Sequence, residues 1–366
     1  MKLGFGLYRH QLNAEHYDFA KQCGATHLVV HLCDYFNKEN STEKEQQDSN
    51  QPVGGTGGWG VAKGDADPIW TLEGLTKLKA EVESHGLKIW AIENFDPAMW
   101  SDILLDGPKK EQQMQGLQDI IRNVGNVGIP VFGYNFSLAG VCSRQVGPVA
   151  RGNANSVYMR EVDETPIPNG MVWNMQLPTD NKGVAPTGDQ DFIPHDVLWQ
   201  RLQWFLKNLV PVAEEAGVRL AAHPDDPPMP IVRKSPRLVY QPDMYHKLLD
   251  MQPSHSNSLE FCLGTIAEMT EGNVYEAVDT FSKREAISYI HFRNVRGKVP
   301  NYDETFIDDG DIDMVKVLEI LKANNYDGIL IPDHTPLMTC DAPWHAGMAF
   351  AMGFMKAAFA QVMGKE

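Results

Sequence analysis

The chain has 366 residues, 43% of them hydrophobic and 22% charged, so it can bury a large core. Its formal net charge of −16 argues against nucleic acid or an anionic membrane as a partner, because these are bound by clustered lysine and arginine. We expect a cytoplasmic protein with reduced thiols. The sequence shows no apolar signal-peptide core and no membrane span of roughly 18 apolar residues, and its five cysteines are scattered.

Short β-rich runs alternate with amphipathic helical patterns along the chain. The predicted strands, in chain order, are Leu3–Leu7, His27–His31, Leu87–Glu93, Val131–Asn135, Val218–His223, Leu259–Cys262, Ile287–Phe292 and Gly328–Ile331. The helical patterns between them include Thr71–His85, Gln112–Val124, Val197–Ala216 and Ile312–Asn324. Eight strand–helix pairs predict an α/β fold, a single (β/α)8 TIM barrel in one domain over residues 1–366.

Two segments match neither a strand nor a helix. Residues 36–67 are polar and rich in glycine, and residues 137–194 mix Pro, Gly, Asn and Asp with isolated Met and Trp. Both follow the carboxyl end of a predicted strand, where barrel enzymes build their sites and lids. We expect long loops that cover the barrel mouth, with Trp59 and Trp173 excluding solvent; unstructured insertions are the alternative.

Polar side chains end four consecutive predicted strands: His223, Cys262, His291 and Asp333. Strand ends of a barrel point into the same mouth, so these residues can converge on one divalent ion. Their mixed nitrogen, sulfur and oxygen donors suit Mn2+ or Fe2+, with Zn2+ as an option. Each residue alone also has a simpler explanation, as a hydrogen-bonded histidine or a buried cysteine. Earlier strands add His31, Glu93 and Asn135 to the same end.

Several longer motifs resemble one known family. The stretch His195–Pro228 contains HPDDPP and is similar to the mannonate dehydratases. The resemblance implies a (β/α)8 barrel, a bound Mn2+ or similar ion held by the four residues above, and removal of water from a sugar acid. It also implies a catalytic role for His334. Further similar motifs lie at Ile121–Phe136, Glu260–Gly264, Tyr289–Val295, Asp309–Met314 and Pro332–His334.

The chemistry suggests roles for these residues. Removing a proton next to a carboxylate requires a base, which suits His334, and a cation that neutralises the developing charge. We expect Arg293 and Arg144 to hold an anionic substrate, with surface ion pairs as the alternative. Asn135 and Asp226 are expected at the substrate as well, although Asp226 could instead orient a histidine ligand or form a plain turn.

The sequence departs from the family at three places. The family's Arg-Trp-Tyr-Gly segment corresponds to GLYRH here, which keeps Tyr8, and Thr335 and Pro336 follow the PDH motif. The family's catalytic tyrosine segment corresponds to PWHAG, which places His345 at the tyrosine position. We therefore expect His345 to protonate the leaving hydroxyl; a helix cap is the alternative.

The expected activity is that of a metal-dependent dehydratase, which converts an aldonic acid such as D-mannonate into a 2-keto-3-deoxy acid. A sugar isomerase or epimerase is the first alternative, because the same ion and base could make an enediolate without expelling water. An inactive carbohydrate-binding homologue is the second, although such a protein would not need His334 as a base. The expected partner is a small sugar acid, and a homo-oligomer is compatible with the sequence.

Overall fold

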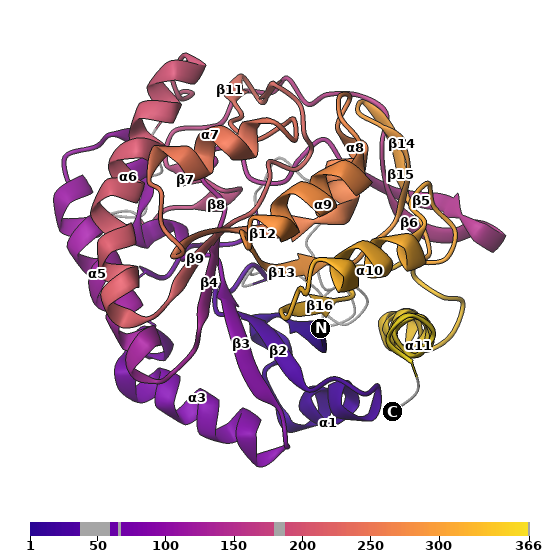
Figure 1. Cartoon of the computed structure of the whole chain (residues 1–366). Helices are drawn as coiled ribbons and strands as arrows, with labels where there is room; N and C mark the ends of the chain where they lie inside the picture. The colour runs from indigo at the N-terminus through magenta and orange to yellow at the C-terminus, as the bar shows by residue number, and fades with distance from the viewer. Residues whose placement is uncertain (37–58, 65–66, 179–186, 365–366) are drawn as a thin grey trace.

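The computed structural model describes residues 1–36, 59–64, 67–178 and 187–364. Parallel strands close into a barrel in the order β1-β16-β13-β12-β9-β4-β3-β2 (Figure 1). The (β/α)8 prediction is confirmed, and each barrel strand begins and ends within two residues of its predicted bounds. The barrel strands are β1 (Lys2–Leu7), β2 (His27–His31), β3 (Lys88–Glu93), β4 (Val131–Tyr134), β9 (Arg219–Ala222), β12 (Asn257–Cys262), β13 (Ile287–His291) and β16 (Ile329–Ile331).

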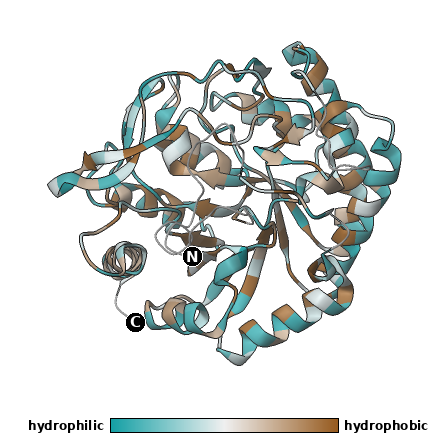
Figure 2. Ribbon diagram, turned by 180° about the vertical axis from the view of Figure 1, so that it is seen from behind, coloured by the Kyte–Doolittle hydropathy of each residue, from teal (hydrophilic) through white to brown (hydrophobic). Residues whose placement is uncertain are grey.

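The barrel strands are mainly apolar on both faces, because helices cover the outer face and the inner face packs in the centre of the barrel. Inside the barrel, Val29, Ala91, Val131 and Ile331 belong to one buried cluster. Figure 2 shows hydrophobic strands at the centre and helices whose outer faces are hydrophilic. The helices are α1 (Ala14–Gln22), α3 (Leu72–Ser84), α4 (Ser101–Leu105), α5 (Lys110–Asn126), α6 (His195–Ala216), α7 (Met244–Met251), α8 (Leu263–Glu268), α9 (Val274–Lys283), α10 (Met314–Ala323) and α11 (Pro343–Met363).

The segment 137–194 contains strands that the sequence pattern did not predict. They are β5 (Gln145–Ala150), β6 (Ala154–Met159), β7 (Met171–Val172) and β8 (Met175–Gln176). β6 pairs with β15 (Asn301–Glu304), which pairs with β14 (Val295–Lys298), so partners more than 140 residues apart make one sheet. β5 also pairs with β6, and β7 with β8, in local hairpins. The loop interpretation missed these strands because they are short and, for β6, because one partner is distant in sequence. Of the segment 36–67, only 36, 59–64 and 67 are described, and the rest of that prediction lies outside the described residues.

Helix α11 is long and apolar enough to cross a membrane by length and composition alone, which the sequence analysis did not anticipate. Its buried face includes Trp344, Met348, Met352 and Met355. The Trp344 ring packs edge-on against Phe5 of β1, with 5.9 Å between the ring centroids. A helix with one face packed on a barrel strand is expected for the outer layer of this fold.

Candidate metal centre at the barrel mouth

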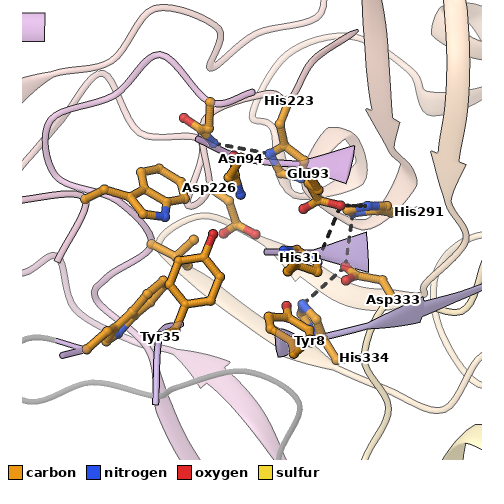
Figure 3. A pocket seen from close by; sticks show the side chains of 14 residues that line it. Tyr8, His31, Tyr35, Glu93, Asn94, His223, Asp226, His291, Asp333 and His334 are labelled. Atoms are coloured by element: carbon orange, nitrogen blue, oxygen red, sulfur yellow. Dashed lines mark hydrogen bonds and ion pairs between the residues drawn. The ribbon is translucent and has the colours of Figure 1, made fainter. Parts of the chain in front are cut away.

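A cavity opens at the carboxyl ends of the barrel strands, where the sequence predicts the site (Figure 3). Its walls combine charged groups from the strand ends with aromatic rings from the loops that follow them. The lining residues are Tyr8, His31, Tyr35, Trp59, Glu93, Asn94, Asn135, Val141, Trp173, His223, Asp226, His291, Asp333 and His334.

Three of the predicted ligands come together beside this cavity. His223 follows β9, Cys262 ends β12 and His291 ends β13, and one ligand atom of each lies within 4.8 Å of the others. Asp333 follows β16, and its Oδ2 lies 3.6 Å from Nδ1 of His291. Neighbouring strands of the barrel carry these residues, which explains how positions far apart in sequence meet.

The two histidines are oriented as metal ligands need to be. Nδ1 of His223 lies 2.5 Å from the carbonyl oxygen of Pro224, so the ring donates that N–H and keeps Nε2 free to coordinate. Nε2 of His291 lies 3.3 Å from Glu93 and 3.2 Å from Glu260. Its buried Nδ1 has no hydrogen-bond partner within the described chain, which leaves one nitrogen facing Asp333 for an ion.

The electrostatics favour a thiolate at Cys262. Burial opposes ionisation, but the charge of Arg293 and the neighbouring imidazoles of His223 and His291 lower the pKa of Cys262 well below its ordinary value. Burial also opposes the charged form of His223, yet Glu260 and Cys262 raise its pKa to about 9. A site that gathers negative charge and an orphaned imidazole nitrogen fits a divalent cation, which replaces the protons on its ligands when it binds.

His334 is held by a residue that the sequence analysis missed. Nδ1 of His334 lies 2.6 Å from Oε2 of Glu304, and Nε2 lies 3.2 Å from Oδ2 of Asp333. Burial opposes ionisation, but His334, Arg293 and Arg144 lower the pKa of Glu304 to about 2. A carboxylate that accepts the Nδ1 proton fixes the tautomer and leaves Nε2 as the basic nitrogen. Glu304 lies on the hairpin strand β15, so no strand-end pattern marks it.

Arg293 is buried among carboxylates and does not line the cavity within the described chain, so the geometry does not favour a direct substrate clamp. Its Nε lies 3.0 Å from Oδ2 of the predicted ligand Asp333, close enough to position that carboxylate. The guanidinium also forms ion pairs with Asp226 at 2.9 Å, Glu268 at 2.9 Å and Glu304 at 3.5 Å, and donates a hydrogen bond to the Thr265 hydroxyl at 3.0 Å.

Arg144 also lies behind the cavity wall, 3.6 Å from Glu304. Both of its terminal nitrogens lack a hydrogen bond to the described residues. Asp226 and Asn135 do line the cavity, and the side-chain amide nitrogen of Asn135 lies 3.4 Å from Nδ1 of His223. Asp225 instead binds Arg237 at 3.1 Å and accepts two backbone N–H groups, so it shapes the HPDDPP loop.

The structure places His345 away from the cavity. It lies in the first turn of α11, where its ring packs edge-on against Phe19 at 4.7 Å between centroids and lies 5.6 Å from His16. His345 is absent from the cavity lining of the described chain. The sequence comparison could give its position in a motif but not the direction in which the helix turns that side chain.

An aromatic wall faces the candidate ligands. Tyr8 stacks on His31 with 4.0 Å between ring centroids, and Trp59 packs edge-on against Trp173 at 6.3 Å. The two tryptophans come from the segments predicted to cover the mouth, and both line the cavity. Burial and the charges of Asp333 and Glu93 raise the pKa of Tyr8 well above its usual value, so its hydroxyl stays protonated at neutral pH.

The fold and the strand-end residues together define a TIM barrel with a metal-type site at its mouth. The D-mannonate dehydratase family model matches residues 49–358. The mannonate dehydratase of Streptococcus pneumoniae is 31% identical over 290 residues, covering 72% of this chain and 74% of that protein. The Lactococcus lactis subsp. lactis mannonate dehydratase is 30% identical over 292 residues, covering 74% and 79%. The chain belongs to the D-mannonate dehydratase family, a family of hydro-lyases by its name.

Solved structures agree with this assignment. The mannonate dehydratase of Streptococcus suis serotype 2 superposes with a TM-score of 0.75 at 26% identity, covering 99% of this chain and 93% of that one. The IOLI protein, whose structure contains a zinc atom, has a TM-score of 0.57 at 11% identity and covers all of both chains. The second likeness shows the shared fold.

Proposed function

We propose that this protein removes water from an aldonic acid such as D-mannonate to give a 2-keto-3-deoxy acid, with one divalent ion bound by His223, Cys262, His291 and Asp333. The observation that carries the proposal is the base His334, held by Glu304 at 2.6 Å directly beside Asp333. Binding alone would need neither a fixed tautomer nor a buried carboxylate behind the histidine.

A bound divalent cation would supply positive charge at the substrate carboxylate and its neighbouring hydroxyl, which stabilises the negative charge formed by proton loss. Mn2+ or Fe2+ is proposed, with Zn2+ as the alternative, because the donor set mixes nitrogen, sulfur and oxygen. Nε2 of His334 takes the proton from the carbon next to the carboxylate, and Glu304 stabilises the resulting imidazolium.

The departing hydroxyl needs a proton donor on the cavity wall. Tyr8 directly follows β1, the strand that pairs with β16, and its hydroxyl stays protonated. Figure 3 shows Tyr8 beside Asp333 and His334. We therefore assign the acid role to Tyr8 rather than to His345, which does not reach the described cavity lining.

Substrate binding is assigned to groups with unused donors or at the cavity wall. Arg144 lies behind the cavity wall with two terminal nitrogens free of hydrogen bonds to the described residues, and its positive charge is proposed to attract the substrate's anionic end from there. Asn135 and Asp226 are proposed to contact its hydroxyl groups from the cavity wall. A cytoplasmic location, a homo-oligomeric state and one domain over residues 1–366 remain parts of this proposal.

The test is incubation of the purified protein with a panel of hexonates in the presence of Mn2+, followed by identification of the product. A keto-deoxy acid is expected from one or a few of them. A rearranged sugar acid with no loss of water would replace the dehydratase assignment by an isomerase or epimerase. Binding without any product would favour an inactive carbohydrate-binding homologue.

Metal analysis of the same preparations tests the ion. Cys262→Ser and His291→Ala are expected to lose at least tenfold in affinity for Mn2+, because each removes or weakens one donor. Cys142→Ser is the matched control, since Cys142 is also a buried cysteine but lies outside the ligand group. Full metal occupancy in both ligand variants would refute the site.

A further inference from the structure

Two buried carboxylates lie next to the metal centre, and the proposed reaction does not use them. Glu93 ends β3, and Glu260 lies on β12 two residues before Cys262. Their exposed fractions are 6% and 0%. One carboxylate oxygen of each lies close to Nε2 of His291, and the three ligand atoms lie within 4.8 Å of one another.

The charge of this pair is compensated differently from that of the other buried carboxylates at the site. Asp226, Glu268, Glu304 and Asp333 all contact the guanidinium of Arg293. In the described part of the chain, the ion pairs of Glu93 and Glu260 are all with histidines. Each of the two carboxylates presents an oxygen to Nε2 of His291, and three ligand atoms that converge in this way can hold one divalent cation.

The donor atoms needed for an ion are present. Neither oxygen of Glu260 has a hydrogen-bond partner among the described residues, and Nε2 of His291 lies 3.3 Å from Glu93 and 3.2 Å from Glu260. Gly133 of β4 gives the carboxylate its space, because a Cβ there would lie 2.5 Å from Oε2 of Glu260 and 2.2 Å from the Tyr289 hydroxyl. The glycine is therefore required for Glu260 to lie where it does.

We propose that Glu93 and Glu260 bind a second divalent cation beside the first, with Nε2 of His291 as the nitrogen ligand. Nε2 of His31 lies 3.6 Å from Oε2 of Glu93, where it can orient that carboxylate. His291 lies between the two sites, with Nδ1 toward Asp333 and Nε2 toward the carboxylates. Carboxylate oxygens with one imidazole suit Mn2+, Fe2+ or Zn2+. The inference rests on the metal centre of the proposed function but not on dehydration as its chemistry.

The test is the stoichiometry of Mn2+ binding to chelator-stripped protein, measured by calorimetry and by metal analysis after dialysis. The wild type is expected to bind two ions per chain, and Glu260→Gln and Cys262→Ser one each. Ser258→Ala is the matched control, because Ser258 is a fully buried polar residue two positions before Glu260 on the same strand. It is expected to keep both ions.

Electron paramagnetic resonance gives a second measurement that does not depend on activity. Two neighbouring Mn2+ ions couple and broaden the resolved hyperfine pattern of an isolated ion, so wild type should show the broadened spectrum and Glu260→Gln the resolved one. If Glu260→Gln fails to fold, the spectrum of Glu93→Gln is compared with that of wild type instead. It should also show the resolved hyperfine pattern of a single ion.

The possible outcomes separate this inference from the proposed function. A single ion that is lost in Cys262→Ser and kept in Glu260→Gln would overturn the second site and leave the proposed function intact. A single ion lost in Glu260→Gln but kept in Cys262→Ser would support the carboxylate site and refute the proposed ligand set.

Discussion

Two groups of buried carboxylates meet at the barrel mouth, and they differ in their positive partners. On the side of β13 and β16, four carboxylates surround Arg293. On the side of β3, the partners of Glu93 and Glu260 are histidines within the described chain. An arginine stays charged at any physiological pH, whereas a histidine can lose its proton. The arginine side is therefore built to position groups, and the histidine side to exchange protons or cations.

The largest expected effect is on turnover, and it follows from changing His334, the proposed base on the arginine side. His334→Asn should lower kcat by about 10²–10⁴-fold, because it removes the base while keeping a polar side chain beside Glu304. The metal content should stay at the wild-type value, and exchange of the substrate's carbon-bound proton with deuterated solvent should be lost with turnover. Retained exchange would show that another group is the base.

Removing the positive charge of Arg293 should destabilise the protein more than removing the negative charge of Glu260. Arg293→Met leaves four carboxylates without their common partner and is expected to lower the free energy of unfolding by about 3–5 kcal/mol. Glu260→Gln removes a charge whose ion pairing within the described chain is with His291 and not with an arginine, so its effect on the metal-free protein should be much smaller. Urea unfolding of both variants in the presence of a chelator makes the comparison, and equal losses would contradict it.

The pH dependence of stability should show the contribution of Glu304, a carboxylate on the arginine side. The pKa of Glu304 is depressed to about 2 from an ordinary 4.5, so its ionised form adds stability that is present above pH 4.5 and is lost as the pH falls toward 2. Wild type should therefore exceed Glu304→Gln by on the order of 3 kcal/mol near neutral pH, and the difference should shrink through that window. A difference that does not depend on pH would contradict the depressed pKa.

The barrel could be predicted because its pattern is local. Each strand is a short apolar run, and each amphipathic helix follows its own periodicity, so α3, α5, α6 and α10 lie close to their predicted bounds. The same regularity predicted that His223, Cys262 and His291 lie close together, since strand ends share one face of a barrel, and their role as metal ligands stays a prediction. Strands β6 and β15 could not be predicted in this way, because each is stabilised by a partner more than 140 residues away.

Residues that hold the cavity-lining side chains in place show the same limit of prediction from sequence. Glu304 reaches His334 only because β15 joins the sheet next to the mouth, and nothing in its sequence surroundings indicates that contact. Arg293 was expected to hold an anionic substrate. Its carboxylate partners show instead that it lies behind the site and positions Asp226 and Asp333. His345 illustrates the reverse case, in which a motif position suggests the site and the helix directs the side chain toward Phe19.

The smallest effect expected on turnover distinguishes Tyr8 from His345. Tyr8→Phe should lower the rate of water loss by about 10²-fold, the lower limit for general acid catalysis, because water can partly replace the phenol at an open mouth. It should still exchange the substrate's carbon-bound proton with deuterated solvent, since His334 is intact. His345→Ala is the control: it removes an imidazole that packs on Phe19 and lies outside the described cavity lining, so turnover and pH profile should match wild type. If His345→Ala instead eliminated water slowly while exchanging normally, the acid would be His345 and α11 would have to turn toward the mouth during the reaction.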